Sequence, residues 1–437
     1  MNLSRSLAQY FEFDKLETNW RTEIVAGLTT FVTMAYIIFV NPSILSETGM
    51  PAAAVTAATC LAASVGSLLM GAFARYPIAL APGMGLNAYF TYAVVKAMGV
   101  PWTVALGAVF LSGVIFLVLT AAGIRRLIFE AIPGELYAAV AVGIGLFIAF
   151  IGLRNAGIVA ISPTTAVTLG NLRDPNTALS LFSLLLISAL MARHVKAAIL
   201  IGIAATTLLG VATGLVHWQP QPYSPSDLAG TIGKLDIRGA LQFGALEIVF
   251  VFLFVDLFDN IGTLVAVGKR ARLFDEHGRI PRVNRILTCD AVATVVGSVT
   301  GTSTVVSYIE SAAGVVAGGR SGVTAIVVGL MFLAALFVAP LAGVIPSAAT
   351  APALIVVGAL MLAHAAEIDW RDPAHSIPAF LTMTTIPLTF SIANGLAFGF
   401  TSFTLIKLVS GRGREVNWVV YALAALFVAR FLYLGKG

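Results

Sequence analysis

Gly301-Thr-Ser-Thr-Val-Val-Ser-Tyr-Ile-Glu310 interrupts an apolar segment with an extended, β-branched run that ends at a carboxylate. Small residues follow at Ser311-Ala-Ala-Gly314 and favour a return to helix. A second apolar segment carries a matching interruption, Pro77-Ile-Ala-Leu-Ala-Pro-Gly-Met-Gly-Leu-Asn87, in which Pro82 and Gly83 open a helix after a short extended run. Broken helices inside a membrane are tolerated only where their unpaired backbone groups face protein or a cavity.

The glycines of these interruptions have two interpretations. Gly83, Gly85 and Gly314 would also let helices pack closely without forming any site. Two matching interruptions favour a site, because half-helices that run in opposite directions would point their N-termini at one another. The pair therefore predicts a central pocket lined by N–H donors.

The composition is that of a membrane protein. The chain has 437 residues, of which 58% are hydrophobic and 11% charged, and its mean hydropathy is +0.94. Soluble domains carry roughly 25% charged residues, whereas a span needs about 20 mainly apolar residues. Apolar segments recur from Ile24 to Leu434 with short polar breaks. Residues 1–22 are charged and lack the apolar core of a signal peptide, so we expect a cytoplasmic N-terminal lead-in.

Glycine, proline and charged residues divide the rest into about fourteen predicted transmembrane segments, in two sets of seven. The first set covers residues 23–41, 52–73, 78–98, 101–122, 135–153, 176–192 and 197–217; the second covers 240–267, 286–300, 303–318, 321–340, 350–365, 377–392 and 394–410. An odd number of spans turns the second set upside down, so we predict an all-α polytopic fold of two inverted repeats.

Each interruption falls in the third segment of its set, and a milder echo links residues 38–45 with 257–264. Inverted repeats of this kind place the substrate site near the membrane midplane, between broken helices. Residues 416–434 do not fit an even count of spans. They either lie in the membrane interface or form an extra crossing.

Basic residues gather in alternate loops, which predicts the orientation. With the N-terminus inside, the cytoplasmic loops hold Arg75, Arg125, Arg126, Arg193, Lys196, the basic residues of 269–285, Arg320, Arg371, Arg412 and Arg414. Arg154, Arg173, Lys234 and Arg238 depart from the pattern, on the two longest outer loops, where the rule is weaker. We expect a multi-pass protein of a bacterial inner membrane.

Neither a cofactor nor a metal is expected. Cys60 and Cys289 lie in apolar segments without metal-binding or disulfide spacing. The histidines are scattered at segment ends and are interpreted as solvated; they are His194, His217, His277, His364 and His375. The net charge of +5 reflects the loops, so nucleic acid is not an expected partner and the lipid bilayer is.

Five carboxylates lie inside apolar segments: Glu247, Asp256, Asp259, Asp290 and Glu310. Ionisable groups at this depth are costly and typical of substrate or proton sites. A helix places Asp256 and Asp259 one turn apart on adjoining faces. Lys and Arg are absent from the middle of the predicted spans, which disfavours simple ion pairs, although a carboxylate could also cap a broken helix.

A planar heterocycle with N–H donors and carbonyl acceptors suits such a pocket. Ionised carboxylates accept hydrogen bonds, while backbone N–H groups and Asn87 donate them. Burial favours the neutral form of a carboxyl group, so one acid is expected to take part in proton coupling. Phe90, Phe258 and Tyr308 could stack on a flat ligand, but apolar aromatics in spans more often serve packing.

For two of the five acids, a supporting role is an alternative to direct contact with a substrate. Asp290 follows the basic loop and could hold a partner on the tenth segment. Glu247 is out of phase with Asp256 by about half a turn and is expected to face elsewhere.

Four motifs resemble those of the AzgA-like purine permeases, a branch of the nucleobase cation symporters with the xanthine/uracil permease-type fold. They are Ala81-Pro-Gly-Met-Gly-Leu-Asn-Ala-Tyr-Phe90, Phe254-Val-Asp-Leu-Phe-Asp-Asn-Ile-Gly-Thr-Leu264, Gly301 to Gly314, and Ser391-Ile-Ala-Asn-Gly-Leu-Ala-Phe-Gly399. The resemblance implies a core domain of residues 23–122 and 240–340. It also implies a gate domain of residues 135–217 and 350–410, followed by a C-terminal segment, 411–437.

The resemblance also ties Asn87, Asp256, Asp259 and Glu310 to purine recognition. Together with Gly83, Phe258, Thr263 and Ser307 they are the candidate substrate-binding residues. Proton coupling or support falls to Asp256, Asp290 and Glu310. No catalytic residue and no metal ligand is expected.

The function that these observations predict is import of purine nucleobases such as hypoxanthine, guanine or adenine by proton symport, with the core moving like an elevator against the gate. The alternatives are a small-anion transporter of the same fold, a passive channel, and an intramembrane aspartyl protease, whose usual Gly-x-Gly-Asp context is missing here. The preferred purine, the proton stoichiometry and a homodimer through the gate stay open.

Overall fold

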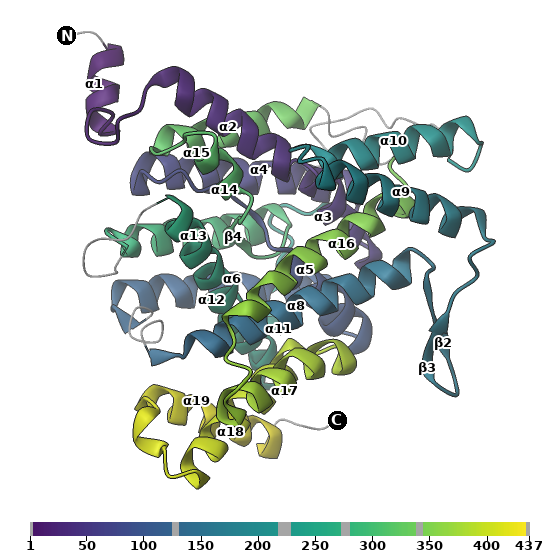
Figure 1. The fold of residues 1–437 in the computed structure, drawn as a ribbon, viewed down its shortest axis with the longest axis vertical. Helices are drawn as coiled ribbons and strands as arrows, with labels where there is room; N and C mark the ends of the chain where they lie inside the picture. The colour runs from purple at the N-terminus through teal and green to yellow at the C-terminus, as the bar shows by residue number, and fades with distance from the viewer. Residues whose placement is uncertain (1–2, 125–130, 217–228, 272–279, 338–343, 434–437) are drawn as a thin grey trace.

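The computed structural model describes residues 3–124, 131–216, 229–271, 280–337 and 344–433. Most of this part of the chain is helical, and Figure 1 shows the long helices running across the molecule. Seven of its helical stretches are long and apolar enough to cross a membrane. The predicted all-α polytopic membrane fold is confirmed. His217, His277, Arg125 and Arg126 lie outside the described residues.

The predicted spans correspond to helices, some of them broken. The first set comprises α2 Trp20–Met34 with α3 Ile37–Leu45, α4 Ala52–Leu69 with η2 Met70–Ala74, β1 Leu80–Pro82 with α5 Met84–Ala88 and η3 Tyr89–Ala97, α6 Trp102–Ala121, α8 Gly134–Asn155, α9 Pro175–Ala192 and α10 Ala198–Ala212. The second comprises α12 Phe243–Ala271, α13 Val283–Thr300, β4 Val305–Ser307 with α14 Ser311–Val316, α15 Gly322–Ala335, α16 Ser347–Met361 with η6 Leu362–Glu367, α17 Pro373–Thr389 and α18 Ile392–Val409.

Several elements lie outside these fourteen segments. They are α1 Leu3–Tyr10, η1 Ser46–Thr48, the hairpin β2 Val159–Ser162 and β3 Ala166–Leu169, α11 Ile237–Ala240, η7 Gly413–Glu415 and α19 Trp418–Tyr433. The hairpin, which projects beyond the end of α8 in Figure 1, falls in a predicted outer loop. At 16 residues, α19 is shorter than the roughly 20 residues that a perpendicular span needs, and it packs on α18.

The centre of the fold is a two-stranded antiparallel pair formed by β1 and β4, with Leu80 opposite Ser307 and Pro82 opposite Val305. Hydrogen bonds from Gly83 N to Thr304 O and from Tyr308 N to Ala79 O, both 2.9 Å, extend the pairing. The predicted extended stretches of the third and tenth segments are therefore confirmed. Because the strands are antiparallel, α5 and α14 leave the pair in opposite directions.

A two-stranded pair has two outer edges, and inside a membrane their backbone groups need partners. Ser67 Oγ of α4 accepts from Leu80 N at 3.0 Å and donates to Leu80 O at 3.1 Å. Thr294 Oγ1 of α13 does the same for Val305 N and Val305 O, both at 3.1 Å. In each set, a hydroxyl of the second segment thus completes the strand of the third, as the inverted-repeat fold requires.

The helices pack in two groups. In one, α6 contacts α12 and α13, while α15 contacts α2 and α4. In the other, α8 contacts α16 and α17, α9 contacts α10 and α16, and α17 contacts α18. The β1–β4 pair lies in the first group, and α8 runs along it by contacting α5 and α12.

Close backbone approach within the first group gives a stability prediction. A Cβ at Gly322 would lie 2.0 Å from Gly71 O, where α15 meets η2, whereas a Cβ at Gly134 meets nothing within 4 Å. We expect Gly322→Ala to destabilise the protein by about 1–3 kcal/mol because the helices must separate. Thermal unfolding of detergent-solubilised protein measures this, with Gly134→Ala as the matched control. Equal melting temperatures for the two variants would contradict the packing described.

Candidate functional site

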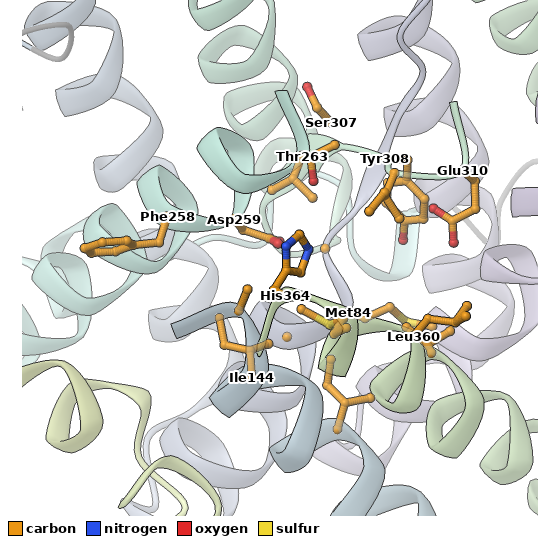
Figure 2. Close-up of a pocket in the computed structure, with 18 of the residues that line it drawn as sticks. Met84, Ile144, Phe258, Asp259, Thr263, Ser307, Tyr308, Glu310, Leu360 and His364 are labelled. Atoms are coloured by element: carbon orange, nitrogen blue, oxygen red, sulfur yellow. The ribbon is translucent and has the colours of Figure 1, made fainter. Parts of the chain in front are cut away.

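A cavity of about 100 Å³ lies beside the β1–β4 pair, where the two helix groups meet (Figure 2). The first group lines it with Tyr36, Gly83, Met84, Gly85, Phe258, Asp259, Thr263 and residues 306–310. The second group lines it with Val140, Ala141, Ile144 and Ile148 of α8, and with Val357, Leu360, Met361 and His364 of α16 and η6. The cavity therefore spans the boundary between the groups.

Asp259 and Glu310, two of the candidate substrate-binding acids, both line this cavity. Glu310 accepts a hydrogen bond from Tyr36 Oη at 2.6 Å. Tyr36 is available because the first span breaks after Met34 and resumes at Ile37, a break that the sequence interpretation did not place. No lysine or arginine lines the cavity in the described part of the chain, so a ligand meets acceptors without a competing cation.

Gly83 and Thr263 complete the neighbourhood of Asp259. A Cβ on Gly83 would lie 3.0 Å from Val306 Cγ2 and 3.5 Å from Asp259 Oδ2, so the start of α5 runs directly beside the carboxylate. Thr263 stands one turn further along α12, and its side chain also faces the cavity. Ser307 contributes to the wall, but its Oγ points away from Asp259 in Figure 2.

Asp256 and Asp290 lie behind the cavity wall and hold Asn260. The Asn260 Nδ2 group donates to Asp256 Oδ1 at 2.9 Å and to Asp290 Oδ2 at 2.5 Å. Its Oδ1 accepts from Ser307 N at 3.0 Å, which ties α12 to β4. Neither acid lines the cavity. The expected supporting role of Asp290 toward the tenth segment has a geometric basis here, through an asparagine that the sequence interpretation did not single out.

Asn87 is also buried away from the cavity. Its Nδ2 donates to Asn41 Oδ1, and its Oδ1 accepts from Ser303 Oγ. Asn41 Nδ2 in turn donates to Thr59 Oγ1 at 2.7 Å and to Thr302 Oγ1 at 2.9 Å. In this structure the Asn87 amide therefore joins the first, third and tenth segments and makes no direct approach to a ligand.

Asn41 and Asn260 occupy corresponding places in the two repeats. Each is the fourth residue of one half of the sequence echo, residues 38–45 and 257–264. Each also links its own helix to the second segment of its set and to the tenth segment. The echo thus marks a pair of amide clamps, a role that requires the spatial neighbours to be known.

The remaining candidates serve packing. Phe258 lines the cavity, but its ring lies 5.0 Å from Tyr137 and 5.8 Å from Phe400. Phe90 packs on Phe252 and does not line the cavity. Tyr308 Oη donates to Pro82 O at 2.5 Å and so bridges the two broken segments. Each of these three residues therefore has a structural contact of its own.

Glu247 and His364 are two further residues for which the sequence analysis gave an expectation. Glu247 forms an ion pair with Arg430 of α19, with Arg430 Nε 2.8 Å from Glu247 Oε1, so its expected supporting role fits. His364 was interpreted as a solvated residue, and this was wrong because it lines the cavity. His364 lies within the short 3-10 helix η6 that follows α16, and no pattern in the sequence marks this place.

A partly open cavity between two broken segments in a multi-pass helix bundle is typical of a membrane transport protein rather than an enzyme. The chain belongs to the Permease family, whose model matches residues 21–398. The resemblance to the AzgA-like purine permeases is confirmed by relatives that match almost end to end.

Three relatives illustrate the match. A putative permease of Methanocaldococcus jannaschii is 53% identical, with 99% of each chain covered. Adenine permease AdeP of Escherichia coli K12 is 44% identical, over 98% of this chain and 96% of the relative. Guanine/hypoxanthine permease PbuG of Bacillus subtilis is 46% identical, over 97% and 99%.

Solved structures share the fold at low identity. The transmembrane domain of a cyanobacterium bicarbonate transporter, BicA, has a TM-score of 0.64 at 15% identity, covering 85% of this chain and 96% of that chain. Murine Solute Carrier 26 family member A9, an anion transporter in the inward-facing state, has a TM-score of 0.59 at 13% identity, covering 90% and 69%. These likenesses concern the fold alone.

The Asn260 clamp gives a prediction about the site's rigidity. Asn260→Ala removes the bonds to Asp256, Asp290 and Ser307 N, and we expect it to cost about 1–3 kcal/mol of unfolding free energy. Exposed Asn176 at the start of α9 provides the control substitution Asn176→Ala. Thermal unfolding of both variants in one detergent is the measurement, and an unshifted Asn260→Ala midpoint would show that the clamp does not stabilise the strand pair.

Proposed function

We propose that this permease is a secondary active transporter that imports purine nucleobases by proton symport. The observation that carries the proposal is the cavity in which Asp259 and Glu310 face an otherwise largely apolar space. The names of the adenine and guanine/hypoxanthine permeases at 44% and 46% identity support the choice of a purine. The anion transporters that share the fold do so at only 13–15% identity, which makes the small-anion alternative weaker.

Purine rings and this cavity have complementary chemistry. Ring and exocyclic N–H groups donate, and the carboxylates of Asp259 and Glu310 accept. The Thr263 hydroxyl can both donate and accept, and the apolar side chains of α8 and α16 suit the faces of a flat ring. We assign direct contact to Asp259, Glu310, Thr263 and Gly83, and the positioning of the strand pair to Asn87, Asp256 and Asp290.

For transport, we assign the first helix group as the core and the second as the gate, following the division that the resemblance implies. The acids and both broken segments belong to the core, while α8 and α16 face them from the gate. The two groups approach closely at Gly85, because a Cβ there would lie 2.4 Å from Ile144 Cγ2. Movement of the core along this wall would carry the bound base across, as in an elevator.

A polar cluster supports alternating access by joining core and gate at one end of α8. Asn155 Nδ2, on the gate, donates to Tyr92 Oη at 2.9 Å and lies 3.3 Å from Glu47 Oε1, both on the core. Lys96 pairs with Glu47 in the same cluster. On the expected orientation this is the outer end, so the cluster holds the outer side closed. We place the N-terminus in the cytoplasm and the protein in the cell membrane.

Uptake of radiolabelled adenine, guanine and hypoxanthine by cells that express the protein tests the function directly. In this assay we expect Asp259→Asn and Glu310→Gln each to lower uptake about 10–100-fold, because a charge-assisted hydrogen bond contributes about 1.5–3 kcal/mol. Asn176→Ala is the control. Preserved or faster transport by Glu310→Gln would favour the small-anion alternative. Uptake that continues at the same rate after the proton gradient is collapsed would favour a channel.

The outer cluster predicts a shift between transporter states. Asn155→Ala removes the gate's hydrogen bonds to Tyr92 and Glu47, and since one such bond contributes about 0.5–1.5 kcal/mol, we expect roughly 2–10-fold more of the outward-open state. The rate at which an external, membrane-impermeant maleimide labels a cysteine placed at Ile148 reports this state. Asn171→Ala, in the same outer loop, is the control. If the Asn155→Ala variant and the protein with Asn155 label at the same rate, Asn155 does not help to close the outer side.

A further inference from the structure

The gate wall of the cavity has one ionisable side chain among the described residues that line it. Val140, Ala141, Ile144 and Ile148 of α8 and Val357, Leu360 and Met361 of α16 are apolar, whereas His364 presents an imidazole. Figure 2 shows the His364 ring in the same cavity as the Asp259 carboxylate. An apolar wall is enough to hold a flat ring, so a lone histidine in it calls for a separate explanation.

His364 is oriented by a carboxylate on its own turn. His364 Nδ1 lies 3.0 Å from Glu367 Oε1, three residues further along η6. The His364 side chain is 15% exposed and that of Glu367 is 49% exposed, so the pair runs from the cavity to the surface. With Nδ1–H donated to Glu367, the neutral ring has its lone pair on Nε2.

We propose that His364 and Glu367 form a proton relay on the gate, which exchanges the co-transported proton between the core acids and the solvent at this end of the cavity. The inference rests on the proposed proton symport and adds the route that the proton takes. A carboxyl O–H of Asp259 or Glu310 gives its proton to His364 Nε2, which leaves a carboxylate and an imidazolium. The imidazolium then loses its Nδ1 proton through Glu367 to bulk water, and reversal of these steps reloads the acid.

Few other charged groups face the relay. From the core, the cavity presents Asp259 and Glu310 with the phenols of Tyr36 and Tyr308. The α8 residues in the cavity are apolar, and Glu135 at the start of α8 lies 3.2 Å from His375 instead. Glu367 is the carboxylate on the same turn. The ring therefore has the Glu367 carboxylate on its own turn and shares the cavity with the two core carboxyl groups, and no lysine or arginine is among the described cavity residues.

The placement of the relay on the gate couples proton transfer to movement. The acids belong to the core and His364 to the gate, so core movement along α8 would separate the donor from the acceptor. Transfer is then limited to the state in which the site faces this end, which prevents a continuous proton leak through the cavity.

The test compares net uptake with exchange in proteoliposomes. His364→Gln keeps a polar group near Nε2 but cannot take up a proton, and Glu367→Gln removes the final acceptor. We expect His364→Gln to slow proton-gradient-driven uptake of the transported base at least 10-fold and to flatten its pH profile. Exchange of internal unlabelled base for external labelled base needs no net proton transfer, and we expect it to stay within about twofold of wild type. We expect Glu367→Gln to have the same two effects in weaker form: slower proton-gradient-driven uptake and nearly unchanged exchange.

His194, exposed in the turn after α9 and in the left-handed backbone region that asparagine tolerates, gives the control His194→Asn. Net uptake by His364→Gln with a wild-type rate and pH profile would overturn the relay and leave purine transport intact. Equal loss of uptake and exchange would also overturn it, because the imidazole would then serve binding. A wild-type protein that transports none of the three bases would overturn the proposed function, and the relay with it.

Discussion

The fold depends on the pairing of two three-residue strands at its centre. Only in this pairing do the two interrupted segments satisfy each other's backbone, which no water could do inside an apolar bundle. The outer edges are closed by Ser67 and Thr294, each of which meets both backbone groups of one strand residue. With the outer edges closed in this way, the chain can leave the helix at membrane depth and place Glu310 and the start of α5 beside a cavity.

The buried polar residues form two layers around this pairing. The inner layer faces the cavity and includes Asp259, Glu310 and Thr263. The outer layer consists of the two amide clamps, Asn41 with Asn87 and Asn260 with its two acids, and it does not reach the cavity. An asparagine suits a clamp because its Nδ2 donates twice while its Oδ1 accepts, so neighbouring oxygens fix its orientation. At Asn260, the remaining Oδ1 accepts from the strand N–H of Ser307.

The sequence was sufficient for the features that are local or costly. Interruptions such as Pro77–Asn87 and acids such as Asp259 and Glu310 stand out in the sequence. Broken backbone and ionisable groups are costly inside a membrane, so an apolar segment retains them only where they have a structural or functional role. The roles of Asn87 and Asn260 were less accessible, since an amide can bind a ligand or a neighbouring side chain and only the fold decides which. The break at Tyr36 and the cavity position of His364 escaped prediction because each depends on one turn of backbone at a helix end.

The contrast between the two walls of the cavity bears on how such a protein can move. The core presents its polar groups already oriented: Glu310 is held by Tyr36, and Ser307 N is held by Asn260. The gate presents mainly smooth side chains, with Gly85 allowing α5 to approach Ile144 closely. Apolar contacts are non-directional, so they can be exchanged along a helix face at little cost, whereas hydrogen bonds across the boundary would fix one position. Two polar groups of the gate face this boundary, Asn155 through its bonds to Tyr92 and Glu47 and His364 through its place in the cavity wall. They lie at opposite ends of the gate, where they can favour one end state without obstructing the path between them.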